Sequence, residues 1–342
     1  MKLNSIRPSC ALLALSALTL LAMPRAVKAQ ESWHATVGSQ SSDMGRQALA
    51  FLPNEIWIHV GDRITWTWQT NLIHTLTFLT LGQPYPSMTV GCPGFSANPA
   101  SFDGSTCVTT PTQVKGQTFT VRFPKAGNYK FECLVHLTMT GVIHVLNVSE
   151  ILPHNQDFYD DQAAAQRKHI LTDTDPNMHH GDELGDDDNA HGFSVHVIRK
   201  HVTAGFGDET ATPGGLQQLA IERFMKDTVE IHAGDTVEWG NFDPDEPHTI
   251  TFGVEPADEF DPSSNVFLDS DGARHAIINS PSENVHSGFI AAVLQDEPGL
   301  PTNPLAGSPT RFRVTFTQPG TYNYRCVLHD NLGMRGKVIV FP

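Results

Sequence analysis

Cysteine, histidine and methionine recur in the same order at two places in this 342-residue chain. Residues 119–146 have the sequence FTVRFPKAGNYKFECLVHLTMTGVIHVL, and residues 312–340 repeat its pattern as FRVTFTQPGTYNYRCVLHDNLGMRGKVIV. In each copy the Cys, His and Met follow a predicted strand within a few residues. Soft sulfur ligands favour Cu(I) and imidazoles suit Cu(II), so a thiolate, an imidazole and a thioether together suit copper. The spacing predicts three of four copper ligands in each copy.

The fourth ligand is expected to be a histidine from the first half of each copy. Residues 51–66 (FLPNEIWIHVGDRITW) align with residues 224–239 (FMKDTVEIHAGDTVEW), and LIHTLTF and EPHTITF follow them downstream. Each copy therefore contains a complete set, and we expect two type 1 coppers per chain. The predicted metal ligands are His74, Cys133, His136 and Met139 in the first copy and His248, Cys326, His329 and Met334 in the second.

The elements that must position these ligands are predicted to be strands. Apolar residues alternate with polar ones at Ile56 and Ile58 before one Gly-Asp turn and at Val229 and Ile231 before another, which is the pattern of half-buried strands. Short strands of this kind are typical of β-sandwiches. We predict an all-β protein with two tandem domains, residues 30–150 and 192–342, and a linker at residues 151–191.

The linker is acidic and contains several histidines, and we expect at most one helix in it, near residues 157–171. Histidines among aspartates can bind metal loosely, but such a segment is more often a solvated connector. The sequence leaves open whether these histidines bind metal. They are His154, His169, His179, His180 and His191.

The ligand motifs resemble those of the cupredoxins. The Cys-x-x-His spacing, the four residues between His329 and Met334, and the Pro-His-Thr around His248 are similar to plastocyanin, whereas the two residues between His136 and Met139 make a short loop similar to that of amicyanin. The resemblance covers roughly residues 48–148 and 192–342. It implies a Greek-key β-sandwich with copper near one end of each domain.

The resemblance also implies an electron port. In the family the second histidine, here His136 or His329, emerges through an apolar surface patch. The residues expected to form these patches are Leu134, Val135 and Leu137 in the first copy and Val327, Leu328 and Leu332 in the second.

The N-terminus predicts export. Basic residues precede an apolar stretch at residues 11–23, and small residues follow, so a signal peptide is expected to end at Ala29. No later stretch is long and apolar enough to predict a membrane span. Loss of residues 1–29 takes the formal net charge from -15 to -19. Such an acidic protein is expected to avoid nucleic acid and to favour partners with a basic face.

Two further cysteines are predicted to form a disulfide. Cys92 and Cys107 have no counterpart in the second copy and flank a segment rich in Gly, Pro and Ser. In an exported protein such a pair is typically oxidised. We expect the disulfide to fix a long insertion and to take no part in copper binding.

These features predict a secreted or periplasmic carrier of single electrons that serves a redox partner such as a c-type cytochrome, an oxidase or a reductase. Two alternatives remain open: a two-domain copper oxidase or nitrite reductase with a catalytic copper at an interface, and a copper storage or delivery protein. One observation argues against the enzyme alternative. In such enzymes a histidine next to the cysteine connects the blue copper to the catalytic copper. Here the residues next to the two cysteines are Glu132, Leu134, Arg325 and Val327.

Overall fold

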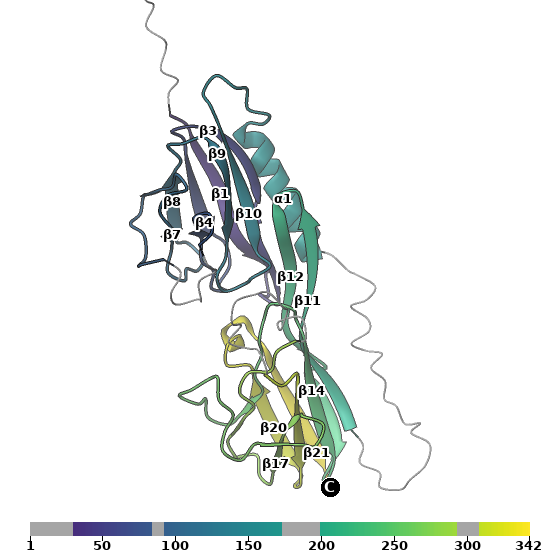
Figure 1. The fold of residues 1–342 in the computed structure, drawn as a ribbon. Helices are drawn as coiled ribbons and strands as arrows, with labels where there is room; N and C mark the ends of the chain where they lie inside the picture. The colour runs from purple at the N-terminus through teal and green to yellow at the C-terminus, as the bar shows by residue number, and fades with distance from the viewer. Residues whose placement is uncertain (1–29, 84–91, 173–198, 293–307) are drawn as a thin grey trace, which may run out of the picture.

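The computed structural model describes residues 30–83, 92–172, 199–292 and 308–342, and these residues form mainly β-strands (Figure 1). The first half of the chain contains ten strands and the α-helix α1. They are β1 (Ser32–Gln40), β2 (Arg46–Leu52), β3 (Glu55–His59), β4 (Arg63–Trp68), β5 (Thr77–Phe78), β6 (Ala100–Ser101), β7 (Val108–Thr109), β8 (Thr118–Arg122), β9 (Gly127–Glu132), β10 (Thr140–Leu146) and α1 (Gln156–Thr172).

The second half contains a matching series of strands and a short 3-10 helix, η3. They are β11 (Arg199–Thr212), β12 (Gly215–Met225), β13 (Thr228–His232), β14 (Thr236–Phe242), β15 (Thr251–Phe252), β16 (Phe267–Leu268), β17 (Arg274–Ile278), β18 (Val285–His286), β19 (Arg311–Phe316), β20 (Gly320–Arg325), η3 (Asp330–Leu332) and β21 (Arg335–Phe341).

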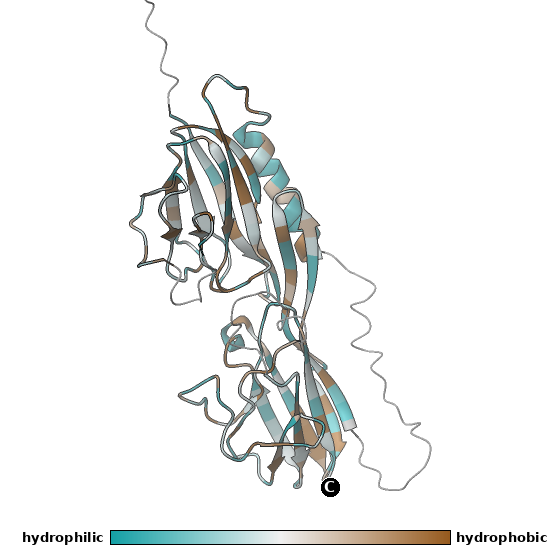
Figure 2. Cartoon of the chain, in the orientation of Figure 1, coloured by the Kyte–Doolittle hydropathy of each residue, from teal (hydrophilic) through white to brown (hydrophobic). Residues whose placement is uncertain are grey.

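Each half folds as a sandwich, which confirms the predicted all-β tandem architecture. One layer of the first sandwich has the strand order β3-β10-β9-β5-β7, and its counterpart in the second has the order β13-β21-β20-β15-β18. The predicted alternation holds in β3 and β4, where Ile56, Ile58, Ile64 and Trp66 are fully buried. In Figure 2 brown, apolar stretches lie on strands of both sandwiches. Burial of such large side chains is the main source of stability for each core.

The other layers of the two sandwiches merge into one sheet, which the sequence did not predict. Strand β12 pairs antiparallel with β2, from Gln218 opposite Leu49 to Ile221 opposite Arg46. This pairing produces an 11-stranded sheet in the order β16-β17-β19-β14-β11-β12-β2-β1-β4-β8-β6. The long hairpin of β11 and β12 runs from one sandwich to the other in Figure 1. The two halves therefore share backbone hydrogen bonds, which fixes one relative to the other.

The predicted helix exists and packs on the first sandwich. Tyr159, Ala163 and Ile170 are its buried residues, and the Tyr159 hydroxyl accepts a 2.8 Å hydrogen bond from the Trp57 amide. The rest of the helix is mostly hydrophilic in Figure 2. The predicted signal peptide and the linker residues from 173 onward, including His179, His180 and His191, lie outside the described residues. Among the residues that are described, no helix is both long and apolar enough to cross a membrane.

The predicted disulfide is present. Cys92 and Cys107 are bonded, with their Cα atoms 5.6 Å apart. In the described part of the chain Cys133 and Cys326 are the cysteines that are not in a disulfide, and both are buried.

We expect the Cys92→Ser variant to keep its copper absorption but to unfold more readily. A disulfide that closes a loop of this size contributes about 3 kcal/mol in the loop-entropy model. Chemical denaturation followed by fluorescence would measure the loss. A variant that is as stable as the parent, or that loses copper colour directly, would contradict the structural role.

Candidate metal centres

Three donor atoms converge in the first sandwich. Cys133 Sγ lies 3.6 Å from His136 Nδ1 and 3.9 Å from His74 Nδ1, and the two Nδ1 atoms are 2.8 Å apart. These separations define a point about 2 Å from all three atoms, which is the length of a metal–nitrogen bond in proteins. All three residues are buried. The donors therefore fit a single small metal ion shielded from water.

The second sandwich repeats this arrangement. Cys326 Sγ lies 3.6 Å from His329 Nδ1 and 3.9 Å from His248 Nδ1, and the Nδ1 atoms are 3.2 Å apart. Its three donors are also equidistant, at about 2 Å, from one point. The same geometry thus arises twice from residues that are far apart in the sequence.

Backbone interactions hold the donors in place. His74 and His248 lie in isolated β-bridges, with Gln113 and Ile290 respectively. The threonine after each of these histidines then contacts the other half of the site: the Thr75 amide lies 3.4 Å from Cys133 Sγ, and the Thr75 hydroxyl accepts a 2.7 Å hydrogen bond from the Leu134 amide.

Thr249 makes the corresponding contacts in the second site. Its amide lies 3.4 Å from Cys326 Sγ, and its hydroxyl accepts a 2.9 Å bond from the Val327 amide. An N–H group directed at sulfur stabilises the thiolate form. In both sites the segment that carries the first histidine is therefore hydrogen-bonded to the loop that carries the cysteine.

The environment of Cys133 favours the thiolate that a metal requires. Burial by itself would raise the pKa of the Cys133 thiol, but the facing His136 and His74 imidazoles outweigh burial and hold the pKa well below its usual range. The thiolate is the form of cysteine that binds metal.

Both methionines close their ligand loops. The Cys133 amide donates to the Met139 carbonyl at 3.0 Å and the Cys326 amide to the Met334 carbonyl at 3.1 Å. Both methionines are fully buried. The longer second loop accommodates its extra residues in η3 and a left-handed Gly333 with φ 97°. An equivalent hydrogen bond, from the cysteine amide to the methionine carbonyl, therefore closes each loop despite their different lengths.

Comparison with known proteins agrees with this geometry. The family model of copper-binding proteins of the plastocyanin/azurin family matches residues 38–146 and 217–341. The chain belongs to this family. Membership implies copper binding and supports a role in electron transfer.

Individual relatives match smaller parts of this cupredoxin. The chloroplastic plastocyanin major isoform of Arabidopsis thaliana is 33% identical over 75 residues, which is 22% of this chain and 42% of that protein. The chain thus matches less than half of the length of this curated relative.

Among solved structures, a reduced Cu(I) form of an amicyanin variant is 19% identical, with a TM-score of 0.24, and the match covers 34% of this chain and 85% of that one. The oxidised plastocyanin of the fern Dryopteris crassirhizoma is 16% identical, with a TM-score of 0.22, and the match covers 41% of this chain and 99% of that one.

The predicted surface position of His136 and His329 is wrong. Their exposed fractions are 1% and 3%. Glu246 of the second domain contacts His136, and His329 faces Glu222 and Glu246 of its own domain. Leu332, expected in a surface patch, instead packs in a buried cluster with Leu49, Leu72 and Ala220 from both domains. Leu134 and Val327 are also buried, while Val135, Leu137 and Leu328 are half-buried.

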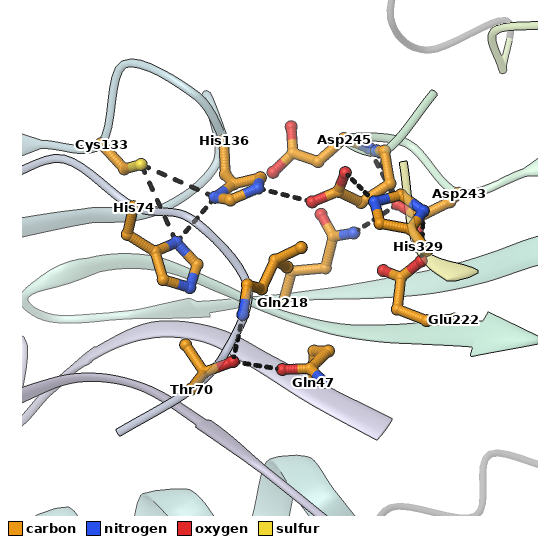
Figure 3. Close-up of polar contacts among 12 residues, drawn as sticks. Gln47, Thr70, His74, Cys133, His136, Gln218, Glu222, Asp243, Asp245 and His329 are labelled. Atoms are coloured by element: carbon orange, nitrogen blue, oxygen red, sulfur yellow. Dashed lines mark hydrogen bonds and ion pairs between the residues drawn. The ribbon is translucent and has the colours of Figure 1, made fainter. Parts of the chain in front are cut away.

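A group of buried carboxylates occupies the space between the two centres, and the sequence analysis missed it. Figure 3 shows His136 between its own cysteine and the loop of the second domain that carries Asp243 and Asp245. Glu246 forms ion pairs with both His136 and His329. Burial would raise the pKa of Glu246, but these two imidazoles outweigh burial and hold the pKa well below its usual range. A buried carboxylate is stable only where such partners compensate its charge.

Glu222 is a second carboxylate of this group, and it distinguishes the two centres. Its Oε2 lies 2.9 Å from His329 Nδ1 and 3.9 Å from His248 Nδ1, so it faces the same nitrogens that face Cys326. Donor atoms of Glu222, Glu246 and His329 lie within 4.8 Å of one another. In the aligned repeat the position of Glu222 corresponds to Leu49, which is apolar and fully buried.

Proposed function

We propose that this protein carries single electrons between redox partners through one type 1 copper in each domain. The ligands would be His74, Cys133, His136 and Met139 in the first domain and His248, Cys326, His329 and Met334 in the second. The convergence of two imidazole nitrogens and one sulfur on a single buried point, twice in the chain, carries this proposal.

The residues are suited to electron transfer because they hold the donors in one arrangement. Each first histidine sits in a β-bridge, each cysteine is tied to the threonine that follows that histidine, and the methionine closes the loop. Copper bound there would supply the change between Cu(I) and Cu(II). A site that is rigid and buried limits the rearrangement that accompanies this change. It also excludes water from the metal.

We further propose that the protein works outside the cytoplasm, after removal of residues 1–29. The formal net charge of -19 that remains favours a partner with a basic docking face, such as a c-type cytochrome, an oxidase or a reductase. Since both His136 and His329 are buried, electrons exchanged with that partner would pass through another part of the surface.

One observation favours a second candidate function. The cluster of Glu222, Glu246 and His329 lies at the domain interface, where a catalytic copper of an oxidase or nitrite reductase would be expected. His329 is, however, also a predicted ligand of the second centre, so a third ion at this cluster would have to share His329.

We expect the copper-loaded protein to contain two coppers and to show no enzyme-like turnover. Metal analysis of the full chain would give the stoichiometry, and a visible spectrum would show whether both ions have thiolate ligands. Assays with nitrite, and with a phenol and oxygen, would test the alternative. A third stoichiometric copper, or turnover near or above 1 per second, the lower end for typical enzymes, would overturn the carrier proposal.

A further inference from the structure

The second histidine of each centre points away from its own metal-binding point and towards the same side chain. His136 Nε2 lies 2.5 Å from Glu246 Oε1, and His329 Nε2 lies 3.4 Å from Glu246 Oε2. In both rings Nδ1 faces the cysteine, so Nε2 is the atom on the opposite edge. The two oxygens of one carboxylate therefore connect an imidazole of the first centre to an imidazole of the second.

This connection is closed to solvent. The exposed fractions are 1% for His136, 4% for Glu246 and 3% for His329. A charged hydrogen bond is stronger in a buried environment than in water, and it also holds its partners closer together. The three side chains thus form a short, dry and polar path between the centres.

The loop that carries Glu246 is held in place from within its own domain. Asp243 Oδ1 accepts hydrogen bonds from the Asp245 and Glu246 amides, both at 3.0 Å, and from Gln218 Nε2 at 2.7 Å. Asn241 Nδ2 donates to the Glu246 carbonyl at 2.7 Å. The backbone on both sides of the bridging carboxylate is therefore fixed.

The same loop is attached to the first domain. The Thr138 amide donates to Asp245 Oδ2 at 3.2 Å, and the Thr138 hydroxyl also contacts that carboxylate. Thr138 lies in the ligand loop between His136 and Met139. Together with the pairing of β12 and β2, this contact sets the distance across the bridge.

We propose that Glu246 is the bridge through which the two centres exchange an electron and influence each other's reduction. This inference rests on the proposed function, that each domain holds a type 1 copper. In the exchange one centre loses one electron and the other gains it, so the step needs no external oxidant or reductant, and no atom or proton has to leave.

The shared carboxylate also couples the two reductions. An oxidised centre, with Cu(II) and one thiolate, carries one positive charge more than a reduced centre. When one centre is reduced, its attraction for Glu246 falls and the carboxylate interacts more strongly with the centre that is still oxidised. The second electron is therefore accepted less readily than the first. Coupling between sites typically changes an equilibrium by about 5- to 150-fold, and the effect is reciprocal.

The test uses the full chain loaded with copper. Rapid partial reduction by a flash-generated reductant should be followed by a redistribution phase whose rate does not depend on protein concentration. In the Glu246→Gln variant this phase should slow by about tenfold or more, because an NH2 group, which is a donor, replaces one of the two carboxylate oxygens, so only one side of the bridge keeps an acceptor. The Glu255→Gln variant, which changes an exposed acid of the same domain, should match the parent.

An equilibrium titration provides a second measurement. The separation between the two one-electron steps should narrow in Glu246→Gln and stay unchanged in Glu255→Gln. Glu246→Asp retains the charge but is one methylene shorter, and it serves as the second variant if Glu246→Gln does not fold.

The outcomes separate the two proposals. One contrary result is a parent that holds two blue coppers but shows no concentration-independent phase, and another is that the Glu246 variants redistribute electrons at the parent rate. Either result would disprove the role of Glu246 in electron exchange and leave the proposed carrier function intact. If the parent holds no blue copper, the proposed function itself fails.

Discussion

Replacing Cys133 with serine is expected to remove about half of the visible thiolate-to-copper absorption, replacing Cys326 is expected to remove the other half, and the double variant should be colourless. The absorption needs a cysteine sulfur bound to copper. In the described part of the chain only Cys133 and Cys326 are outside a disulfide, since Cys92 and Cys107 are bonded to each other. Each centre contains one of these two cysteines.

Optical titration with copper, together with metal analysis, would measure this effect. The Cys92→Ser variant is the matched control, because it makes the same change at a cysteine that faces neither centre. Circular dichroism of each variant would show that the sandwiches remain folded. If one single substitution removed all the colour, the two centres could not both be independent type 1 sites.

The convergence of the histidine and cysteine donors could be predicted because the ligand motif is local. Cys133 and His136, or Cys326 and His329, are held by one tight loop whose length is visible in the sequence, and alignment of the two copies identifies the more distant His74 and His248. The strands were predictable for a similar reason, because alternation at Ile56 and Ile58 depends only on which face of one strand is buried.

The relation between the two centres could not be predicted in this way. It depends on the pairing of β12 with β2, which joins residues about 170 positions apart, and such pairing follows from three-dimensional packing. Family resemblance also misled at this point, because a histidine that reaches the surface in a single domain is covered when a second domain packs against it. His136, which contacts Glu246 of the second domain, is buried for this reason, and His329 is buried as well.

The sequence did contain signs of the interface. Asp243, Asp245 and Glu246 stand immediately before His248, whereas the residues immediately before His74 are uncharged, and Glu222 aligns with Leu49. Charged residues that replace apolar or neutral ones near a repeated ligand motif indicate that the two copies differ in function. What the sequence could not show is that these carboxylates are buried against the histidines of both centres.

Glu222 allows the sign of the difference between the two centres to be predicted. Its carboxylate lies 2.9 Å from His329 Nδ1, whereas the corresponding Leu49 in the first domain carries no charge. A buried anion close to the metal stabilises Cu(II) more than Cu(I), because the interaction grows with the charge on the metal. We therefore expect the second centre to have the lower reduction potential, so that an electron shared between the domains resides mainly in the first.

The Glu222→Leu variant should reverse this effect by making the second centre resemble the first. Two unit charges about 4 Å apart interact by about 4 kcal/mol at an effective dielectric constant of 20, and relaxation of the surroundings reduces this value. We expect the potential of the second centre to rise by roughly 60 mV or more, which corresponds to a tenfold change in a one-electron equilibrium. Leucine at the matching position of the first domain is fully buried, so this framework accommodates it.

Redox titration in a Cys133→Ser background would isolate the second centre. Glu222→Gln removes the charge while keeping the shape, and it should raise the potential in the same direction. Glu230→Gln changes an exposed acid of the same domain and should have little effect, because solvent and salt screen an exposed charge. In the other domain, Leu49→Glu should lower the potential of the first centre. If neither Glu222 variant moved the potential beyond the Glu230 control, the carboxylate would have no electrostatic influence on the second centre, and the difference between the two would have to come from the lengths of their ligand loops.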